Sequence, residues 1–344
     1  NGFKIAVNIL NIGRVKLGAG VLGGARTVTS QCIRYSAERK QFGVSINTFG
    51  AIKAKLAEMA TRIYATESLC YRAGQDIEDR MGALAAQGLS DSEAKLKAME
   101  QFSIECAIAK VHGSEVLDYI VDQGVQIYGG MGYSADAPME RAYRDARISR
   151  IYEGTNEINR MLMVGMVLKR AMKGEINLFE PAMAVASELV SVPSFESIDT
   201  SELFAMEKDL VYKLKKVFLM VGGKAAMALQ DRIEDEQEIM MNLADVMIEI
   251  YAAESVLLRT EKLVSQRGEG ACAAQIAMSR IYLYEAIDKV EAAAKEAIVS
   301  FAKGDEQKVM LMGLKRFTKP DFVNTKELRR QVADVMIAEG KYPF

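Results

Sequence analysis

The chain has 344 residues with a formal net charge of −2, and half of its residues are hydrophobic. This length allows two or three domains, and the near-zero charge gives no case for a nucleic-acid surface. Five prolines, 20 methionines and no tryptophan favour long helices packed on one another. No run of about 18 apolar residues occurs, so the sequence predicts no membrane-spanning helix.

The cysteines and the single histidine predict no metal site. His112 has no plausible metal partner, so we interpret it as an ordinary helix residue. The four cysteines form no CxxC pair and stand among apolar neighbours, namely Cys32, Cys70, Cys106 and Cys272. Such buried free thiols predict a reducing, intracellular compartment, with a bacterial cytoplasm favoured and a mitochondrial matrix possible. The chain begins at Asn1 without a methionine, and we expect a fragment of a longer protein.

Residues 3–38 are predicted to form one long helix, because apolar residues recur at helical spacing from Ile5 to Val21. The segment Gly18–Gly23 fits the pattern GxGxxG. A dinucleotide-binding fingerprint needs a preceding strand and a parallel sheet, and the sequence around it predicts only helices. We therefore interpret these glycines as small residues that let another helix approach closely.

The segment Glu38–Gly43 is predicted to end this helix. Gly43 is a natural stop, and cations in a last turn suit the helix dipole. An ordinary helix end is favoured, and an anion-binding arginine stays open as the alternative.

The next helices are predicted at 48–80, 91–128 and after Pro138, with a polar loop at 82–92. A glycine cluster, Gln126–Tyr133, follows the third of these helices. A charge run beginning at Arg144 leads to Glu153, and Thr155 is predicted to cap a helix that ends near 173. Residues 1–173 therefore predict an all-α, up-and-down bundle.

A linker is predicted at 174–200, where Gly174, Pro181, Pro193 and several serines interrupt the pattern. Helices at 201–233, 235–267, 270–303 and 321–339 form a second predicted bundle, 201–344. Leu56–Ser68 matches Leu243–Ser255 at a constant offset of 187 residues, which predicts a duplication. The second copy has no counterpart of the glycine cluster or of Glu153, so we expect it to be non-catalytic.

An apolar face between Leu210 and Val221 is flanked by several lysines. A bundle helix with a solvated basic face is favoured, and a helix on a membrane surface is the alternative.

The residues around Glu153 suggest proton abstraction. A carboxylate beside flexible glycine can act as a base near neutral pH if it is desolvated. The glycine cluster would let backbone amides approach a planar or phosphorylated ligand, and nearby arginines pair with phosphates. A charged helix junction held by Arg–Asp pairs is the alternative.

At these residues the chain resembles the carboxy-terminal part of the acyl-CoA dehydrogenase family, strongly over residues 1–173. The similarity lies in four segments that occur in the family's order and spacing: Glu38–Gly43, Gln126–Tyr133, Arg144–Ile148 and Ile151–Ile158. The opening segments Gly2–Ala6 and Ile9–Arg14 resemble the very-long-chain branch, which carries an extra helical domain after the catalytic bundle. The family's amino-terminal helical domain and middle β-domain have no counterpart here, so the chain alone is not expected to hold FAD.

The resemblance implies an oxidoreductase of fatty acid β-oxidation that converts acyl-CoA, with longer chains favoured, to trans-2-enoyl-CoA. Glu153 matches the base that removes the pro-R α-proton while the β-hydrogen leaves as hydride to flavin N5. Some members carry the base on the first helix, at the position of Gly13 here, which leaves Glu153 as the sole candidate. The implied substrate-binding residues are Asn11, Arg14, Tyr152 and Gly154.

The resemblance also implies the cofactor contacts and the partners. Arg39 and Gln41 match residues that reach FAD across a subunit interface, with Phe42 packing beside them. The implied contacts to the FAD adenosine and pyrophosphate are Gln126, Gly129 and Gly130, and those after the base are Thr155 and Glu157. The implied partners are acyl-CoA, an electron-transfer flavoprotein and further copies in a dimer or tetramer, with membrane contact at most peripheral. An acyl-CoA oxidase and a non-catalytic helical scaffold are the alternatives.

Overall fold

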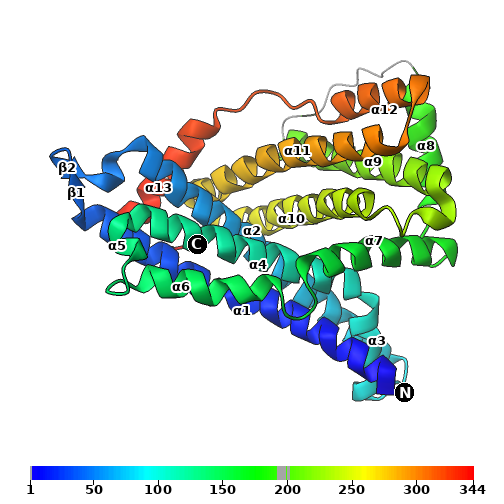
Figure 1. Ribbon diagram of the computed structural model, residues 1–344, viewed down its shortest axis with the longest axis horizontal. Helices are drawn as coiled ribbons and strands as arrows, with labels where there is room; N and C mark the ends of the chain where they lie inside the picture. The colour runs from blue at the N-terminus through cyan, green and yellow to red at the C-terminus, as the bar shows by residue number, and fades with distance from the viewer. Residues whose placement is uncertain (1, 192–198, 200–201) are drawn as a thin grey trace. The chain divides into compact units, whose positions relative to one another are not determined.

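The computed structural model describes residues 2–191, 199 and 202–344, and among residues 3–7 it describes the backbone only. The expectations for the Ile5 side chain and for Pro193 therefore lie outside the described residues. The fold is all-α, as predicted (Figure 1). Contacts divide the chain into two compact units: Asn1–Asn156 with Lys262–Tyr282 and Asn324–Phe344, and Glu157–Glu261 with Leu283–Val323.

The first unit is built on three long helices. Helix α1 packs chiefly along α4 and also along α2. Its elements are α1 (Gly2–Glu38), β1 (Lys40–Gln41), β2 (Val44–Ser45), η1 (Ile46–Thr48), α2 (Gly50–Ala86), α3 (Asp91–Gln101), α4 (Ser103–Tyr128), α5 (Gly130–Tyr133), α6 (Pro138–Arg147), η2 (Ile148–Arg150) and α13 (Thr325–Glu339).

The loop predicted at 82–92 is shorter than expected. Helix α2 continues to Ala86, and Ser90 starts α3 with a capping box in which Glu93 is the reciprocal partner. The helix predicted at 91–128 is two helices, because α3 ends at Gln101 and α4 begins at Ser103.

Gly18 allows α1 to approach α4. A Cβ built on Gly18 would lie 2.5 Å from the backbone carbonyl oxygen of Ala109. Gly20 and Gly23 meet nothing within 4 Å. The close-approach interpretation is therefore confirmed at Gly18 and wrong for the other two glycines.

Replacing Gly18 with alanine is expected to destabilise the protein by about 1–3 kcal/mol, because backbone cannot yield as a side chain does. Gly23→Ala is the matched control on the same helix, where alanine gains up to about 1 kcal/mol in helix propensity. Urea unfolding of both variants measures the difference. Equal midpoints would show that α1 and α4 are not in close contact at Gly18.

Gly43 does not cap α1, so that part of the prediction is wrong. The helix ends at Glu38, and a two-stranded antiparallel hairpin follows, pairing Lys40 with Ser45 and Gln41 with Val44. The two turn residues, Phe42 and Gly43, have φ angles of 53° and 84°. Positive φ at both positions is the requirement of a type I′ turn, a common two-residue hairpin turn, and glycine supplies it readily.

The remaining helices are α7 (Asn156–Met172), α8 (Phe179–Val190), α9 (Ala205–Leu229), η3 (Gln230–Arg232), α10 (Gln237–Arg267), η4 (Gly270–Cys272), α11 (Ala273–Phe301) and α12 (Gly304–Phe317). The second unit contains most of their residues, whereas the end of α10, η4 and the start of α11 belong to the first unit. Helix α8 lies inside the stretch predicted as a linker. Helix α12 was not predicted; acids open it and basic residues close it, as the helix dipole favours.

Helix α13 was expected in the second bundle, and the structure packs it along α2 in the first unit. Ion pairs join the two helices, with Lys53 Nζ 2.5 Å from Asp334 Oδ1 and Arg329 Nε 3.6 Å from Glu58 Oε2.

The two matched segments form the same local bond in α2 and α10. Ser68 Oγ donates to the Tyr64 carbonyl at 2.6 Å, and Ser255 Oγ donates to the Tyr251 carbonyl at 2.6 Å. This agreement supports the predicted duplication.

The basic face of α9 is occupied by ion pairs. Each of its five lysines lies beside a carboxylate: Lys208–Glu261, Lys213–Asp209, Lys215–Glu254, Lys216–Glu188 and Lys224–Glu306. Lysines paired within the unit favour the bundle-helix interpretation over the membrane-surface one.

All four cysteines are free and buried, as predicted. Burial raises the pKa of Cys32, Cys70 and Cys106 to about 12, so these thiols stay protonated in the folded chain. His112 is also buried, between the hydroxyls of Thr66 and Tyr282. Within the described part of the chain, no helix combines the length and apolarity that crossing a membrane requires.

Candidate active site

The loop between η2 and α7 carries Glu153 in an unusual backbone conformation. Glu153 has a φ of 60° and Gly154 a φ of 81°. A left-handed conformation costs a non-glycine residue about 1–2 kcal/mol, and it persists only where the surroundings impose it. The strain therefore points to a function at Glu153.

Arg14 anchors the loop from α1. Its Nε donates to the Glu153 carbonyl at 3.3 Å, and its Nη1 donates to Asn11 Oδ1 at 3.1 Å. Both Arg14 and Asn11 are buried. Burial lowers the pKa of Arg14, while the nearby Cys106 and Glu153 act in the opposite direction. Because the ordinary arginine pKa is so high, the guanidinium stays charged.

Lys110 anchors the same loop from α4. Its Nζ donates to the Gly154 carbonyl at 2.8 Å and to Asn156 Oδ1 at 2.6 Å, and its exposed fraction is 0%. Hydrogen bonds from charged donors contribute about 1.5–3 kcal/mol each, enough to offset the strain at Glu153. Lys110 was not identified from the sequence. The available signal is a lone lysine within the apolar run Cys106–Val111.

Gly13 provides the space that the Glu153 carboxylate occupies. A Cβ built on Gly13 would lie 2.5 Å from Oε2 and 2.8 Å from Oε1 of Glu153. The carboxylate therefore lies directly against the backbone of α1, in a half-buried position. This arrangement can place a base beside a bound substrate.

The structure brings the predicted substrate-binding residues together around Glu153. Asn11 and Arg14 lie beneath the loop, and Tyr152 and Gly154 flank Glu153 within it. Tyr152 is 48% exposed, so its ring is available to an apolar ligand.

The predicted cofactor residues fall into two groups. Thr155 lies in the loop that carries Glu153, residues 151–155, which we call the base loop, and Glu157 lies in the first turn of α7. The others lie where α1 and α4 end, near the hairpin and α5 (Figure 1). We call this second group the hairpin surface: Arg39, Gln41, Phe42, Gln126, Gly129 and Gly130. The rings of Tyr35 and Tyr128 stack at 3.9 Å and join the two helices there.

The hairpin surface offers free donors and open backbone. Phe42 is 93% exposed, and among the described residues the Arg39 and Gln41 side chains have no hydrogen-bond or ion-pair partner. A Cβ on Gly129 or Gly130 would meet nothing within 4 Å. An anionic ligand with aromatic rings fits this combination.

Distance separates the two groups within one chain. Gly13 and Glu38 lie 25 residues apart on α1, which corresponds to about 38 Å at about 1.5 Å per residue. The hairpin surface therefore lies far from the base loop of the same chain.

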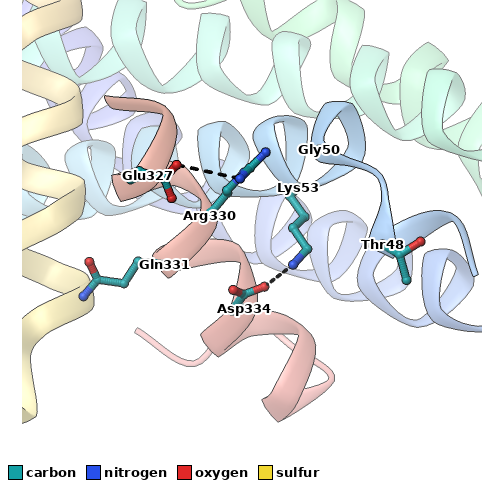
Figure 2. A pocket seen from close by; sticks show the side chains of 7 residues that line it. All are labelled: Thr48, Gly50, Lys53, Glu327, Arg330, Gln331 and Asp334. Atoms are coloured by element: carbon teal, nitrogen blue, oxygen red, sulfur yellow. Dashed lines mark hydrogen bonds and ion pairs between the residues drawn. The ribbon is translucent and has the colours of Figure 1, made fainter. Parts of the chain in front are cut away.

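Figure 2 shows a polar pocket between α2 and α13. It is lined by Thr48, Gly50, Lys53, Glu327, Arg330, Gln331 and Asp334. Its charges pair with one another, Lys53 with Asp334 at 2.5 Å and Arg330 with Glu327 at 3.7 Å. None of the predicted site residues lines it. The described residues also contain no cluster of His, Cys, Asp or Glu suited to a metal ion.

Two family models match the two halves of the chain. The model described as "Acyl-CoA dehydrogenase, C-terminal domain" matches residues 1–168, and a second model with the same description matches residues 213–316.

Known proteins agree with these matches. A probable acyl-CoA dehydrogenase of Bacillus subtilis is 40% identical over 99% of this chain and 57% of its own length. The very long-chain specific acyl-CoA dehydrogenase of Rattus norvegicus is 32% identical over 77% of this chain and 40% of its own length. A crystal structure of an acyl-CoA dehydrogenase complexed with FAD from Bacillus anthracis superposes with a TM-score of 0.94 at 40% identity, covering 99% of this chain and 57% of that one. The chain thus spans 57% of the length of the two bacterial relatives and 40% of the length of the rat enzyme.

Proposed function

Because the chain belongs to the acyl-CoA dehydrogenase family, we propose that it provides the base for FAD-dependent α,β-dehydrogenation of an acyl-CoA thioester. The observation that carries this proposal is the Glu153 carboxylate, seated against Gly13 on a strained loop that two buried cations anchor.

Glu153 is proposed to take the α-proton of the substrate onto its carboxylate. The thioester oxygen is proposed to accept a hydrogen bond from the backbone amide of Glu153. This bond would stabilise the enolate-like charge as it forms. Tyr152 and Arg14 lie beside the base, where they can border the thioester. The reaction yields trans-2-enoyl-CoA.

FAD fits the hairpin surface. The unpaired Arg39 guanidinium suits a pyrophosphate, exposed Phe42 suits an aromatic ring, and Gly129 and Gly130 allow backbone approach. Bound FAD would supply the acceptor for the two electrons and the hydrogen lost from the β-carbon.

The proposed active site combines two copies of the chain. Because about 38 Å of helix separates Gly13 from the hairpin, Arg39 and Gln41 of one copy would serve the base loop of another. This separation supports the cross-subunit contact that the family resemblance implies. We propose a homo-oligomer, a dimer or a tetramer.

The substrate and partners are proposed from the relatives. Similarity to the very long-chain specific enzyme supports a substrate with a longer acyl chain, and we propose a role in fatty acid β-oxidation. Electrons would then pass to an electron-transfer flavoprotein. The bacterial relative and the four buried free thiols support a reducing bacterial cytoplasm, with membrane contact at most peripheral.

Anaerobic titration of the full-length, FAD-loaded protein with palmitoyl-CoA tests this function. We expect the flavin absorbance to bleach, and reoxidation by an electron-transfer flavoprotein to outpace reoxidation by oxygen. Stoichiometric peroxide formation in air would instead indicate an oxidase. Absence of bleaching, or purification of the full-length protein without FAD, would reject a dehydrogenase.

A further inference from the structure

Lys110 connects the middle of α4 to the loop that carries Glu153. Its ammonium donates to the Gly154 carbonyl at 2.8 Å and to Asn156 Oδ1 at 2.6 Å. These acceptors lie one and three residues after Glu153. We propose that Lys110 is a positioning residue that fixes the direction of the Glu153 side chain. This inference rests on the proposed function, in which Glu153 is the base.

Holding the positive charge of Lys110 at this position costs electrostatic free energy for two reasons. The side chain is fully buried, so its ammonium has lost its contacts with water. Asn156 is also the first residue of α7, where the helix dipole disfavours a cation. A neutral donor could reach the same oxygens at a lower cost. What a cation adds is a stronger and shorter hydrogen bond.

The loop needs a strong anchor because its backbone is both strained and flexible. Glu153 has a φ of 60°, and Gly154, with a φ of 81°, has no side chain to restrict it. Arg14 reaches the Glu153 carbonyl at 3.3 Å, slightly beyond the usual range for such bonds. Lys110 reaches the next carbonyl at 2.8 Å. Of these two anchors, Lys110 therefore makes the firmer contact.

Asn156 fixes the position of the ammonium in turn. Its Nδ2 donates to Ser114 Oγ at 3.0 Å and to Glu115 Oε1 at 3.0 Å, both on α4. Lys110, Asn156 and α4 thus form a closed network that joins the loop to a rigid helix. Consecutive peptide groups after Glu153 are held from α1 and from α4, which leaves the carboxylate little freedom to leave its place against Gly13.

Replacing Lys110 with methionine tests this role, because methionine keeps the unbranched shape and lacks the donor. The measurement is the single-turnover rate constant of flavin bleaching in the full-length, FAD-loaded protein at saturating palmitoyl-CoA. We expect this constant to fall about ten- to hundredfold, the order of effect expected for the loss of one charge-assisted hydrogen bond to the loop. Substrate affinity is expected to stay close to wild type, and α-deuterated substrate should react more slowly by a full primary isotope effect.

A merely structural role would change different quantities. Loss of folded or FAD-loaded protein lowers the amplitude of bleaching but not its rate constant. The matched control is Arg26→Gln, which breaks an ion pair with the fully buried Glu67 about 20 Å along α1 from Gly13. This control is expected to melt at a lower temperature with a wild-type rate constant.

Lys110→Gln is the test variant if the methionine variant does not fold, because glutamine keeps a neutral hydrogen-bond donor at the same place. Its rate constant is expected to fall less than that of Lys110→Met. Bleaching at the wild-type rate in whichever variant folds would refute the positioning role while leaving the dehydrogenase function intact. Failure of the wild-type protein to bleach would instead refute the proposed function.

Discussion

Replacing Glu153 with glutamine is expected to slow flavin bleaching by acyl-CoA by about 10²- to 10⁴-fold, the usual worth of a general base. Glutamine has the same shape, so it keeps the position against Gly13 and the anchors to Arg14 and Lys110. Its amide cannot accept a proton. At the α1 position where the family resemblance allows an alternative base, this chain has Gly13, which cannot accept a proton.

The measurement is stopped-flow bleaching of the full-length protein, with FAD content and substrate-analogue affinity determined in parallel. Both of these are expected to match wild type. Asp145→Asn is the matched control, since it removes an exposed carboxylate in the same charge run. Bleaching by Glu153→Gln within about tenfold of wild type would remove Glu153 from the mechanism.

Replacing Gly13 with alanine is expected to lower the bleaching rate about 10²-fold, because displacement of a reacting group by about 1 Å can cost that much. The new Cβ would lie 2.5 Å from Oε2 of Glu153, and the carboxylate must move because it is the flexible partner. The free energy of unfolding is expected to rise. Gly13 lies inside α1, where alanine gains up to about 1 kcal/mol in helix propensity.

The combination of higher stability and lower activity distinguishes this effect from damage to the fold. Gly23→Ala is again the control, because it gains the same propensity where nothing lies within 4 Å. It should be more stable and fully active. A Gly13→Ala variant with wild-type bleaching would show that the carboxylate does not occupy the space beside α1 during the reaction.

The sequence predicted the helices of the fold better than their ends and partners. Apolar spacing is a local signal, and it correctly indicated the long helix from residue 3 to residue 38. It could not show that Gly43 belongs to a hairpin turn, because a glycine after a helix suits both a cap and a turn. It also could not assign α13 to the first unit, since that packing depends on pairs such as Lys53 with Asp334, which are 281 residues apart.

The candidate site was only partly accessible from sequence for a similar reason. Glu153 and Arg14 stand in recognisable segments, and the structure joins them through a hydrogen bond. Lys110 lies in no such segment, and a lysine on a long helix normally indicates a solvated face. Its burial and its contact with the loop appear only once α4 is placed against residues 153–156.

Exchange of the substrate's α-hydrogen with solvent tests the role of Glu153 most directly, because it reports proton removal without electron transfer. The full-length, FAD-loaded protein would be incubated in D₂O with a 3-thia-acyl-CoA, in which sulfur replaces the β-carbon, and deuterium at the α-carbon would be followed by NMR. The wild-type protein is predicted to incorporate deuterium, and Glu153→Gln is predicted to show only the background rate. Exchange by Glu153→Gln at the wild-type rate would contradict the assignment of Glu153 as the base.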